Sequence, residues 1–70
     1  MGFIFTIHAE LRIKKRKLTK EEIIDTVKYP DITLKKYDKY YVQKKIKRGT
    51  IEVVYEKKEK FIRIITVYWL

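Results

Sequence analysis

The spacing of hydrophobic residues changes from a helical to a strand-like period near the middle of the chain. Before Pro30, apolar side chains recur every three or four residues, which is typical of amphipathic helices. From Ile32 onward, apolar and polar residues alternate or form short apolar runs bounded by turn residues, which is typical of strands. The pattern predicts an α+β fold, with an N-terminal helical hairpin packed on an antiparallel sheet of three or four strands.

The first predicted helix follows the short apolar run Phe3–Thr6, which is either an edge strand or a hydrophobic lead-in. Thr6 is the expected N-cap, because its hydroxyl can accept a free amide of the first turn. At 100° per residue, Ile7, Leu11 and Leu18 project to one side. We expect them to face the core.

The second predicted helix begins at a tight corner over Lys17–Thr19. Thr19, with Glu22 three residues later, has the spacing of a capping box. Pro30 ends the helix, because the residue before a proline is pushed out of helical geometry. The two helices are expected to span about ten residues each.

The strand region begins at Ile32–Leu34, and Asp38–Lys39 is the expected turn after it. Tyr40–Lys47 and Thr50–Glu56 should pair as a hairpin across Arg48–Gly49, because glycine tolerates positive φ.

The last predicted strand, Phe61–Leu70, follows a polar reversal at Lys57–Lys60. Its single charged side chain, Arg63, either points to solvent or is held in a site, and is a candidate catalytic residue. On a regular strand, Arg63 and Tyr68 face opposite sides and cannot line one site. We expect Arg63 to share its side with Val67 and Trp69.

Length and residue types limit the chemistry. Seventy residues predict a single domain over 1–70, near the size at which a core gives marginal stability. Without cysteine and with one histidine, neither a disulfide nor a conventional zinc site is expected, and we predict no metal and no cofactor. The apolar runs are shorter than the ~20 residues that span a bilayer, so we expect a cytoplasmic protein without a membrane segment.

Eighteen Lys and Arg against nine Asp and Glu give a formal net charge of +9. On so small a protein this charge implies an anionic partner, such as RNA or the ribosome, an acidic protein or an anionic membrane surface. Asparagine is absent and lysine, glutamate and isoleucine are abundant, a bias seen in hyperthermophile proteins. A thermophilic source would account for part of the lysine content.

His8, Arg12 and Arg16 lie four residues apart and form one polar stripe on a helix. Histidine can take the proton of a ribose 2′-hydroxyl and arginine can hold a phosphate through two donors, so the stripe is a candidate ribonuclease site. The alternative is structural: His8 makes a hydrogen bond at the helix start, and the arginines pair with acids such as Asp25 or with sheet carbonyls.

Two basic clusters are candidates for nucleic-acid binding. Nearby tyrosines strengthen the second, because aromatic rings stack on bases while lysines neutralise phosphates. The alternative is that the lysines form a solvated surface and the tyrosines are ordinary strand residues. The candidate residues are Lys14, Lys15 and Lys17 in the first cluster, and Tyr40, Lys44, Lys45, Lys47 and Arg48 in the second.

A resemblance to a known family rests on the segment His8-Ala9-x-x-Arg12-x-x-x-Arg16, the capped helix ending at Pro30, the strand Ile51–Glu56 and the ending Thr66–Tyr68. With these features, nearly the whole chain resembles the family named domain of unknown function 4258. Members commonly have glycine after the second arginine, where Lys17 stands here. The family has no established activity. Its size, layer order and basic sheet are similar to RelE-type and BrnT-type toxins, which are ribonucleases neutralised by antitoxins.

The leading hypothesis is therefore a basic RNA-binding protein of the toxin-like class, whose partner is an acidic antitoxin-like protein. After binding mRNA, the protein would cleave it without a metal ion. The alternative is a non-catalytic interaction module or regulator that binds an acidic protein or DNA. DNA is the weaker choice, because neither helix resembles a recognition helix. Both a monomer and a homodimer are compatible with the sequence, since Trp69–Leu70 with Phe3 and Phe5 either completes the core or forms a contact patch.

Overall fold

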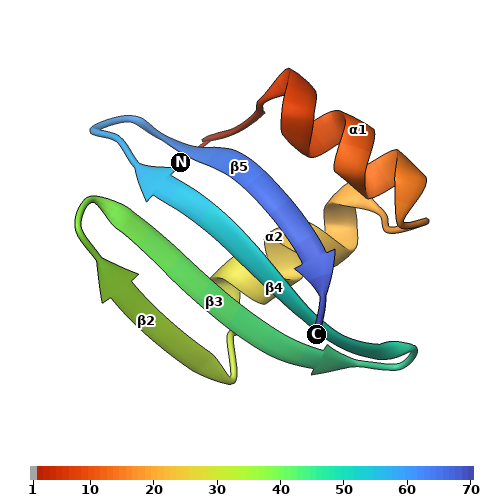
Figure 1. Cartoon of the computed structure of the whole chain (residues 1–70). Coiled ribbons are helices and arrows are strands. Elements are labelled where there is room, and N and C mark those ends of the chain that lie inside the picture. Colours follow the sequence, from red (N-terminus) through yellow and green to blue (C-terminus); the bar gives the residue numbers. More distant parts are fainter. Residues whose placement is uncertain (1) are drawn as a thin grey trace.

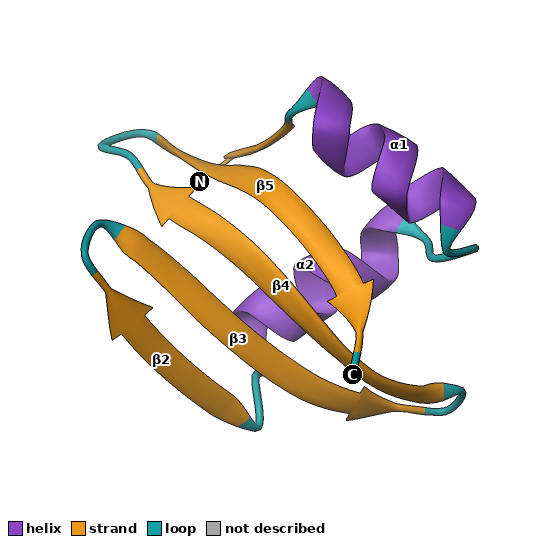
Figure 2. Ribbon diagram, viewed as in Figure 1, coloured by secondary structure: helices purple, strands orange, loops and turns teal. Residues whose placement is uncertain are grey.

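The computed structural model describes residues 2–70, which form a five-stranded sheet and two helices (Figure 1; Figure 2). One short strand precedes the helices, and four strands follow them. The elements are β1 Gly2–Phe5, α1 Ile7–Lys15, α2 Lys20–Lys28, β2 Ile32–Lys36, β3 Lys39–Ile46, β4 Gly49–Lys57 and β5 Phe61–Trp69.

The strand order is β1-β5-β4-β3-β2, in which β1 runs parallel to β5 and every other pair is antiparallel. The α+β class is confirmed, but the prediction of three or four antiparallel strands is wrong. The run starting at Phe3 is a fifth strand, and its partner lies at the other end of the chain. Four residues are too few to show a strand period, so their pairing could not be predicted from their spacing. Because β1 reaches only Ile64, it covers the first half of β5.

The β3–β4 hairpin is confirmed, with Ile46 opposite Gly49. Gly49 has φ +143°, and a Cβ there would lie 3.2 Å from the Trp69 ring, so glycine is required for both conformation and space. The β2–β3 turn lies at Tyr37 and Asp38, one residue before the predicted position. Tyr37 has φ 60°, a left-handed conformation that the aromatic side chain did not predict.

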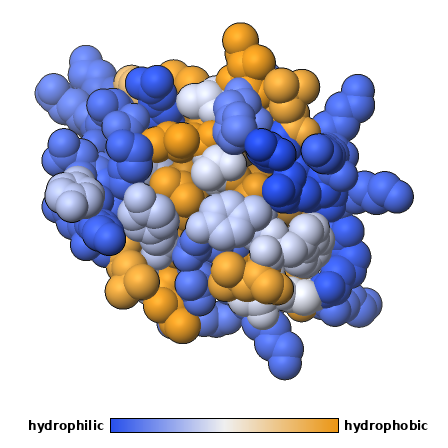
Figure 3. All heavy atoms as spheres, viewed as in Figure 1, coloured by the Kyte–Doolittle hydropathy of each residue, from blue (hydrophilic) through white to orange (hydrophobic). Residues whose placement is uncertain are grey.

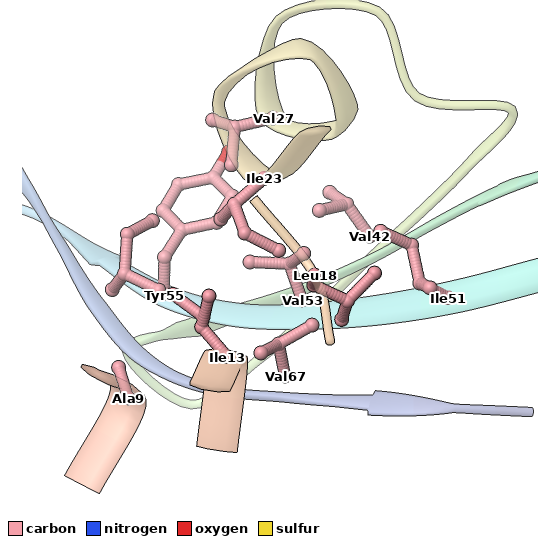
Figure 4. Packing of buried hydrophobic residues seen from close by; sticks show 11 residues of the cluster. Ala9, Ile13, Leu18, Ile23, Val27, Val42, Ile51, Val53, Tyr55 and Val67 are labelled. Carbon is pink, nitrogen blue, oxygen red and sulfur yellow. The ribbon is translucent and has the colours of Figure 1, made fainter. Parts of the chain in front are cut away.

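Both helices cover one face of the sheet and enclose the core there (Figure 4). α1 packs on β5, and α2 packs on β3 and β4. The centre of the core is β4, in which every residue from Ile51 to Tyr55 is buried. The buried cluster is Ala9, Ile13, Leu18, Ile23, Val27, Val42, Ile51, Val53, Tyr55, Ile64 and Val67.

α2 begins and ends where the sequence predicts. The Thr19 hydroxyl accepts the amide of Glu22 at 3.1 Å, and the Glu22 carboxylate accepts the amide of Thr19 at 2.9 Å, which completes the capping box. The helix ends at Lys28, two residues before Pro30. The box fixes the Glu22 carboxylate at the start of α2, beside the β3–β4 turn that it contacts through Arg48.

The opposite face of the sheet carries no helix, and in Figure 1 α2 lies behind the strands. Figure 3 shows this open face, with pale and hydrophobic atoms across its middle and hydrophilic atoms around them. Within residues 2–70, no helix is long and apolar enough to cross a membrane.

Candidate nucleic-acid interface

The start of α1 is attached to an irregularity in β5. Thr6 is the N-cap, as predicted, and its hydroxyl accepts the Ala9 amide at 3.0 Å. The same hydroxyl donates to the Ile65 carbonyl at 3.1 Å, and the Thr6 amide donates to the Ile64 carbonyl at 3.1 Å. Two successive carbonyls of β5 therefore hold the first turn of α1.

This attachment sets the rotation of α1 about its axis. Ala9 is fully buried against the sheet and Ile13 is nearly so, whereas Ile7 is 79% and Leu11 62% exposed. The prediction that Ile7 and Leu11 face the core is wrong. With Thr6 tied to β5, the small Ala9 side chain allows the close approach, and the larger Ile7 and Leu11 are turned to solvent.

His8, Arg12 and Arg16 lie along the flank between these two sides of α1. The Arg12 Nε donates to His8 Nε2 at 3.3 Å, so His8 accepts through Nε2 in its neutral form. His8 is exposed, and the other two residues are half-buried. Arg16 is the C-cap, and its carbonyl accepts the Trp69 indole N–H at 3.3 Å.

The corner after α1 is a Schellman motif built on lysine. Lys17 has φ 57°, its amide donates to the Lys14 carbonyl, and the Leu18 amide donates to the Ile13 carbonyl at 2.9 Å. Leu18 and Ile13 are both buried. Lys17 thus has the left-handed conformation that glycine favours.

Four acidic side chains, Glu10, Glu22, Asp25 and Glu56, form the ion pairs of the described residues. Five ion pairs occur among residues 2–70, and none includes Arg12 or Arg16; Asp25, the suggested partner, is 3.8 Å from Lys44 instead. The remaining cationic side chains of this segment, at Lys14, Lys15 and Lys17, are exposed and form no ion pair with another described residue. The flank and C-terminal end of α1 therefore present a group of cations that the fold leaves free.

The predicted basic cluster around β3 is divided between structural and free side chains. Arg48 donates to the Glu22 carboxylate at 2.8 Å and to the Lys17 carbonyl at 2.9 Å. Lys44 donates to the Tyr29 carbonyl at 2.7 Å. Arg48 hydrogen-bonds the Glu22 carboxylate and thereby lowers its pKa, although partial burial opposes the shift.

The rest of this cluster lies on different surfaces. Lys45 and Lys47 have exposed side chains that form no ion pair in the part of the chain that the structure describes. Tyr40 lies on the helix-covered face, where its ring is stacked on Tyr55 at 5.0 Å between centroids. Its other neighbour is Lys35, whose Nζ lies 5.4 Å from the Tyr40 ring centroid. Tyr40 therefore does not form a stacking platform together with Lys45.

Arg63 and Tyr68 lie on the same face of the sheet, which corrects the prediction from a regular strand. Val54 pairs with Thr66 and Tyr55 pairs with Ile64, so Ile65 is an extra residue in the ladder. This β-bulge reverses which face of the sheet the side chains of β5 before Ile65 point to, compared with a regular strand. Arg63 therefore faces the open side, opposite Glu56 at 3.8 Å, rather than sharing the side of Val67 and Trp69.

Glu52 was not identified as a candidate from the sequence. It lies in one row across the open face with Gln43 and Tyr68, and it is only 7% exposed. Its carboxylate accepts the Gln43 amide at 2.9 Å and the Tyr68 hydroxyl. In the sequence, Glu52, Val54 and Glu56 alternate with apolar residues, which indicates that they share one face of a strand. This pattern does not identify Gln43 and Tyr68 as the partners of Glu52.

The unpaired cations on α1 are an arrangement that can bind an anion. Within residues 2–70, no group of three or more His, Cys, Asp or Glu side chains has the geometry to hold a metal ion. Arg63 and the row of Glu52 lie on the open face of the sheet, whereas the stripe from His8 to Arg16 lies on α1. The candidate catalytic residues thus belong to separate surfaces, and the free cations are densest on α1.

Comparison with known proteins identifies a family but no characterised relative. No curated protein and no solved structure matches the chain. The model of the family described as Domain of unknown function (DUF4258) matches residues 5–69, from the end of β1 to the end of β5, so the chain belongs to the DUF4258 family.

Proposed function

We propose that the protein binds RNA through the flank and C-terminal end of α1. The observation that carries the proposal is that Arg12 and Arg16 have no acidic partner, although the fold forms five ion pairs elsewhere within residues 2–70. Together with Lys14, Lys15 and Lys17 they form a concentrated positive surface. Such a surface attracts the phosphate backbone without regard to base sequence.

Arg12 is the central residue of the proposed interface. Its Nε is engaged by His8, which orients the guanidinium group, and the two terminal nitrogens remain available. A guanidinium group held in this way can donate two parallel hydrogen bonds to one phosphate. The half-buried position of Arg12 also reduces the entropy lost when a phosphate binds.

We further propose that the protein is related in function to RelE-type and BrnT-type toxins, with RNA cleavage as the step after binding. His8 is the candidate base. To act, it has to give up the hydrogen bond that Nε2 accepts from Arg12. The geometry therefore supports binding more strongly than cleavage.

The second candidate function is a non-catalytic interaction module. It is favoured by the two exposed aliphatic side chains on the outer side of α1, Ile7 and Leu11. Beside the cations of α1, they match a partner that offers apolar and acidic side chains together. An acidic antitoxin-like protein fits both this candidate and the toxin-like one.

The test of RNA binding is fluorescence anisotropy with a labelled single-stranded oligonucleotide over a series of salt concentrations. The variant Arg12→Gln/Arg16→Gln should bind more weakly and lower the slope of log K against log salt by about 1.4, since each phosphate contact contributes roughly 0.7. The matched control is Lys36→Gln/Lys60→Gln, which removes the same charge from two exposed lysines that lie away from α1 and form no ion pair within residues 2–70.

Equal losses in the two variants would mean that net charge alone attracts RNA, and the proposed interface would be rejected. Absence of binding at low salt would reject RNA as the ligand. For cleavage, the measurement is the loss of full-length oligonucleotide with time. His8→Ala should no longer cut RNA at protein concentrations that saturate binding, although it should bind more weakly because Arg12 loses the hydrogen bond that orients it. Cutting at an unchanged rate under saturation would remove His8 from the reaction.

A further inference from the structure

A second site lies on the helix-covered face of the sheet, beyond the end of α2. There a half-open cavity of about 330 Å³ separates α2 from the edge of the sheet. Residues of β1, α2, β4 and β5 meet in its wall, so its shape depends on the fold rather than on one loop. The lining residues are Phe3, Val27, Lys28, Tyr55, Lys57 and Ile62.

The inner wall of the cavity is apolar and contains one neutral donor. Phe3, Val27 and Ile62 provide hydrocarbon surface, and the ring of Tyr55 is buried against Val27 (Figure 4). The Tyr55 hydroxyl makes no side-chain hydrogen bond within residues 2–70, where every buried side-chain N or O atom has a partner. The hydroxyl oxygen therefore reaches the solvent of the cavity.

The protonation of Tyr55 supports its role as a donor. Burial raises the pKa of Tyr55, and the neighbouring Tyr40 raises it further. The phenol thus keeps its proton near neutral pH and can donate a hydrogen bond.

The mouth of the cavity is positive. Lys28 and Lys57 line it, form no ion pair within residues 2–70, and have no acidic neighbour in the lining. The adjoining cavity, which shares Lys57, differs because Asp38 and Glu56 line it. Two unpaired cations and a phenol around an apolar space complement a molecule that has an anionic head and an apolar body.

We propose that this cavity binds a small carboxylic acid with an aromatic or branched apolar body. The body occupies the space between Phe3, Val27 and Ile62. The carboxylate receives the Tyr55 hydroxyl and the ammonium groups of Lys28 and Lys57. The site is separate from the α1 flank and does not depend on RNA binding.

The experiment is an NMR titration of the ¹⁵N-labelled protein with 4-phenylbutyrate at 0.15 M salt. The matched probe is 4-phenylbutylamine, which has the same apolar body and the opposite charge. The acid should shift the amides of the lining residues and bind at least ~10-fold more tightly than the amine, since both cations favour it. Shifts spread over the whole surface, or equal affinity for the two probes, would overturn the proposal.

Two sets of variants distinguish the contribution of the lysine charges to binding from that of the Tyr55 hydroxyl. Lys28→Gln/Lys57→Gln should remove the preference for the acid, and Tyr55→Phe, which keeps the ring, should weaken binding several-fold. The control Lys47→Gln/Lys60→Gln changes the net charge equally outside the cavity and should bind as the wild type does. Retention of the preference in Lys28→Gln/Lys57→Gln, or its loss in the control, would show that the cavity does not select the carboxylate.

Discussion

The basic side chains of α1 and those of the β3–β4 hairpin have similar sequence patterns but different surroundings. At the hairpin, Arg48 contacts a carboxylate, a backbone carbonyl and the ring of Trp69, whose centroid lies 5.6 Å from its guanidinium carbon. On α1, the Arg12 guanidinium hydrogen-bonds only His8 among the described residues, and the Arg16 guanidinium forms no hydrogen bond or ion pair with them. At the hairpin, Arg48 thus uses its charge within the fold, whereas Arg12 and Arg16 of α1 form no ion pair within residues 2–70.

The difference follows from the positions of fixed acceptors. The capping box holds Glu22 at the first turn of α2, beside the β3–β4 turn, so Arg48 meets a carboxylate that is already ordered. The acid within α1 itself, Glu10, pairs with Lys20 of α2 at 2.8 Å and not with the arginines of α1. A run of basic residues therefore predicts a binding surface only where the fold places no acidic side chain close enough to form an ion pair with it.

The largest effect in this comparison is expected at Gly49. Gly49→Ala places a Cβ 3.2 Å from the Trp69 ring and retains φ +143°, which alanine rarely adopts. The ring is held by Arg48 and by the Arg16 carbonyl, so it cannot move freely. We expect a loss of about 2–3 kcal/mol in the free energy of unfolding, measured by urea denaturation.

The control for this substitution is Gly2→Ala, because a Cβ at Gly2 meets nothing within 4 Å. Its effect should stay within about 0.5 kcal/mol. Similar effects of the two substitutions would show that Trp69 is not fixed by the hairpin.

The second largest effect separates the two regions directly. Arg48→Gln removes the hydrogen bonds to Glu22 and Lys17 and the contact with Trp69, and should cost about 1–2 kcal/mol. Arg16→Gln should cost less than about 0.5 kcal/mol, since the Trp69 indole bonds the carbonyl and not the side chain. The measurement is urea denaturation of both variants. Equal costs would mean that the cations of α1 are structural as well.

Local features of the fold could be predicted from the sequence. Thr6, Thr19 and Pro30 mark the ends of the helices because each acts through groups within four residues of itself. The β3–β4 hairpin could be predicted for the same reason, from Gly49 between two strand-like runs. The family could also be predicted, and its model matches residues 5–69.

Long-range features could not be predicted. The rotation of α1 depends on a bond between Thr6 and Ile65, 59 residues apart, and hydrophobic periodicity alone pointed to Ile7 and Leu11. The placement of Arg63 depends on the bulge at Ile65, and one extra residue changes which side every earlier position faces. For the site, the stripe on α1 was predictable, whereas the partners of Arg48 and Glu52 required the tertiary structure.

The third prediction concerns the pH dependence of the pair between Glu22 and Arg48. Because the pKa of Glu22 is lowered in the folded state, its contribution to stability is complete above the ordinary glutamate value of 4.5 and is lost as the pH falls through the lower folded value. Urea denaturation should therefore show a difference between the wild type and Arg48→Gln at pH 7 that narrows as the pH falls below about 4.5. A constant difference down to pH 3 would show that Glu22 does not contribute through its charge.

The smallest effect is expected at Lys17, which connects the two regions because its carbonyl accepts Arg48 while its side chain lies in the α1 group. Lys17→Gly relieves a left-handed conformation at φ 57° and should raise the free energy of unfolding by about 0.5–1 kcal/mol. The control Lys14→Gly lies inside the helix and should lower it by a similar amount. If the Lys17 side chain contacts phosphate, Lys17→Gly should also lower the salt slope of RNA binding by about 0.7, despite the gain in stability. A gain in stability with an unchanged slope would remove the Lys17 side chain from the RNA interface and leave its backbone with a role in the fold alone.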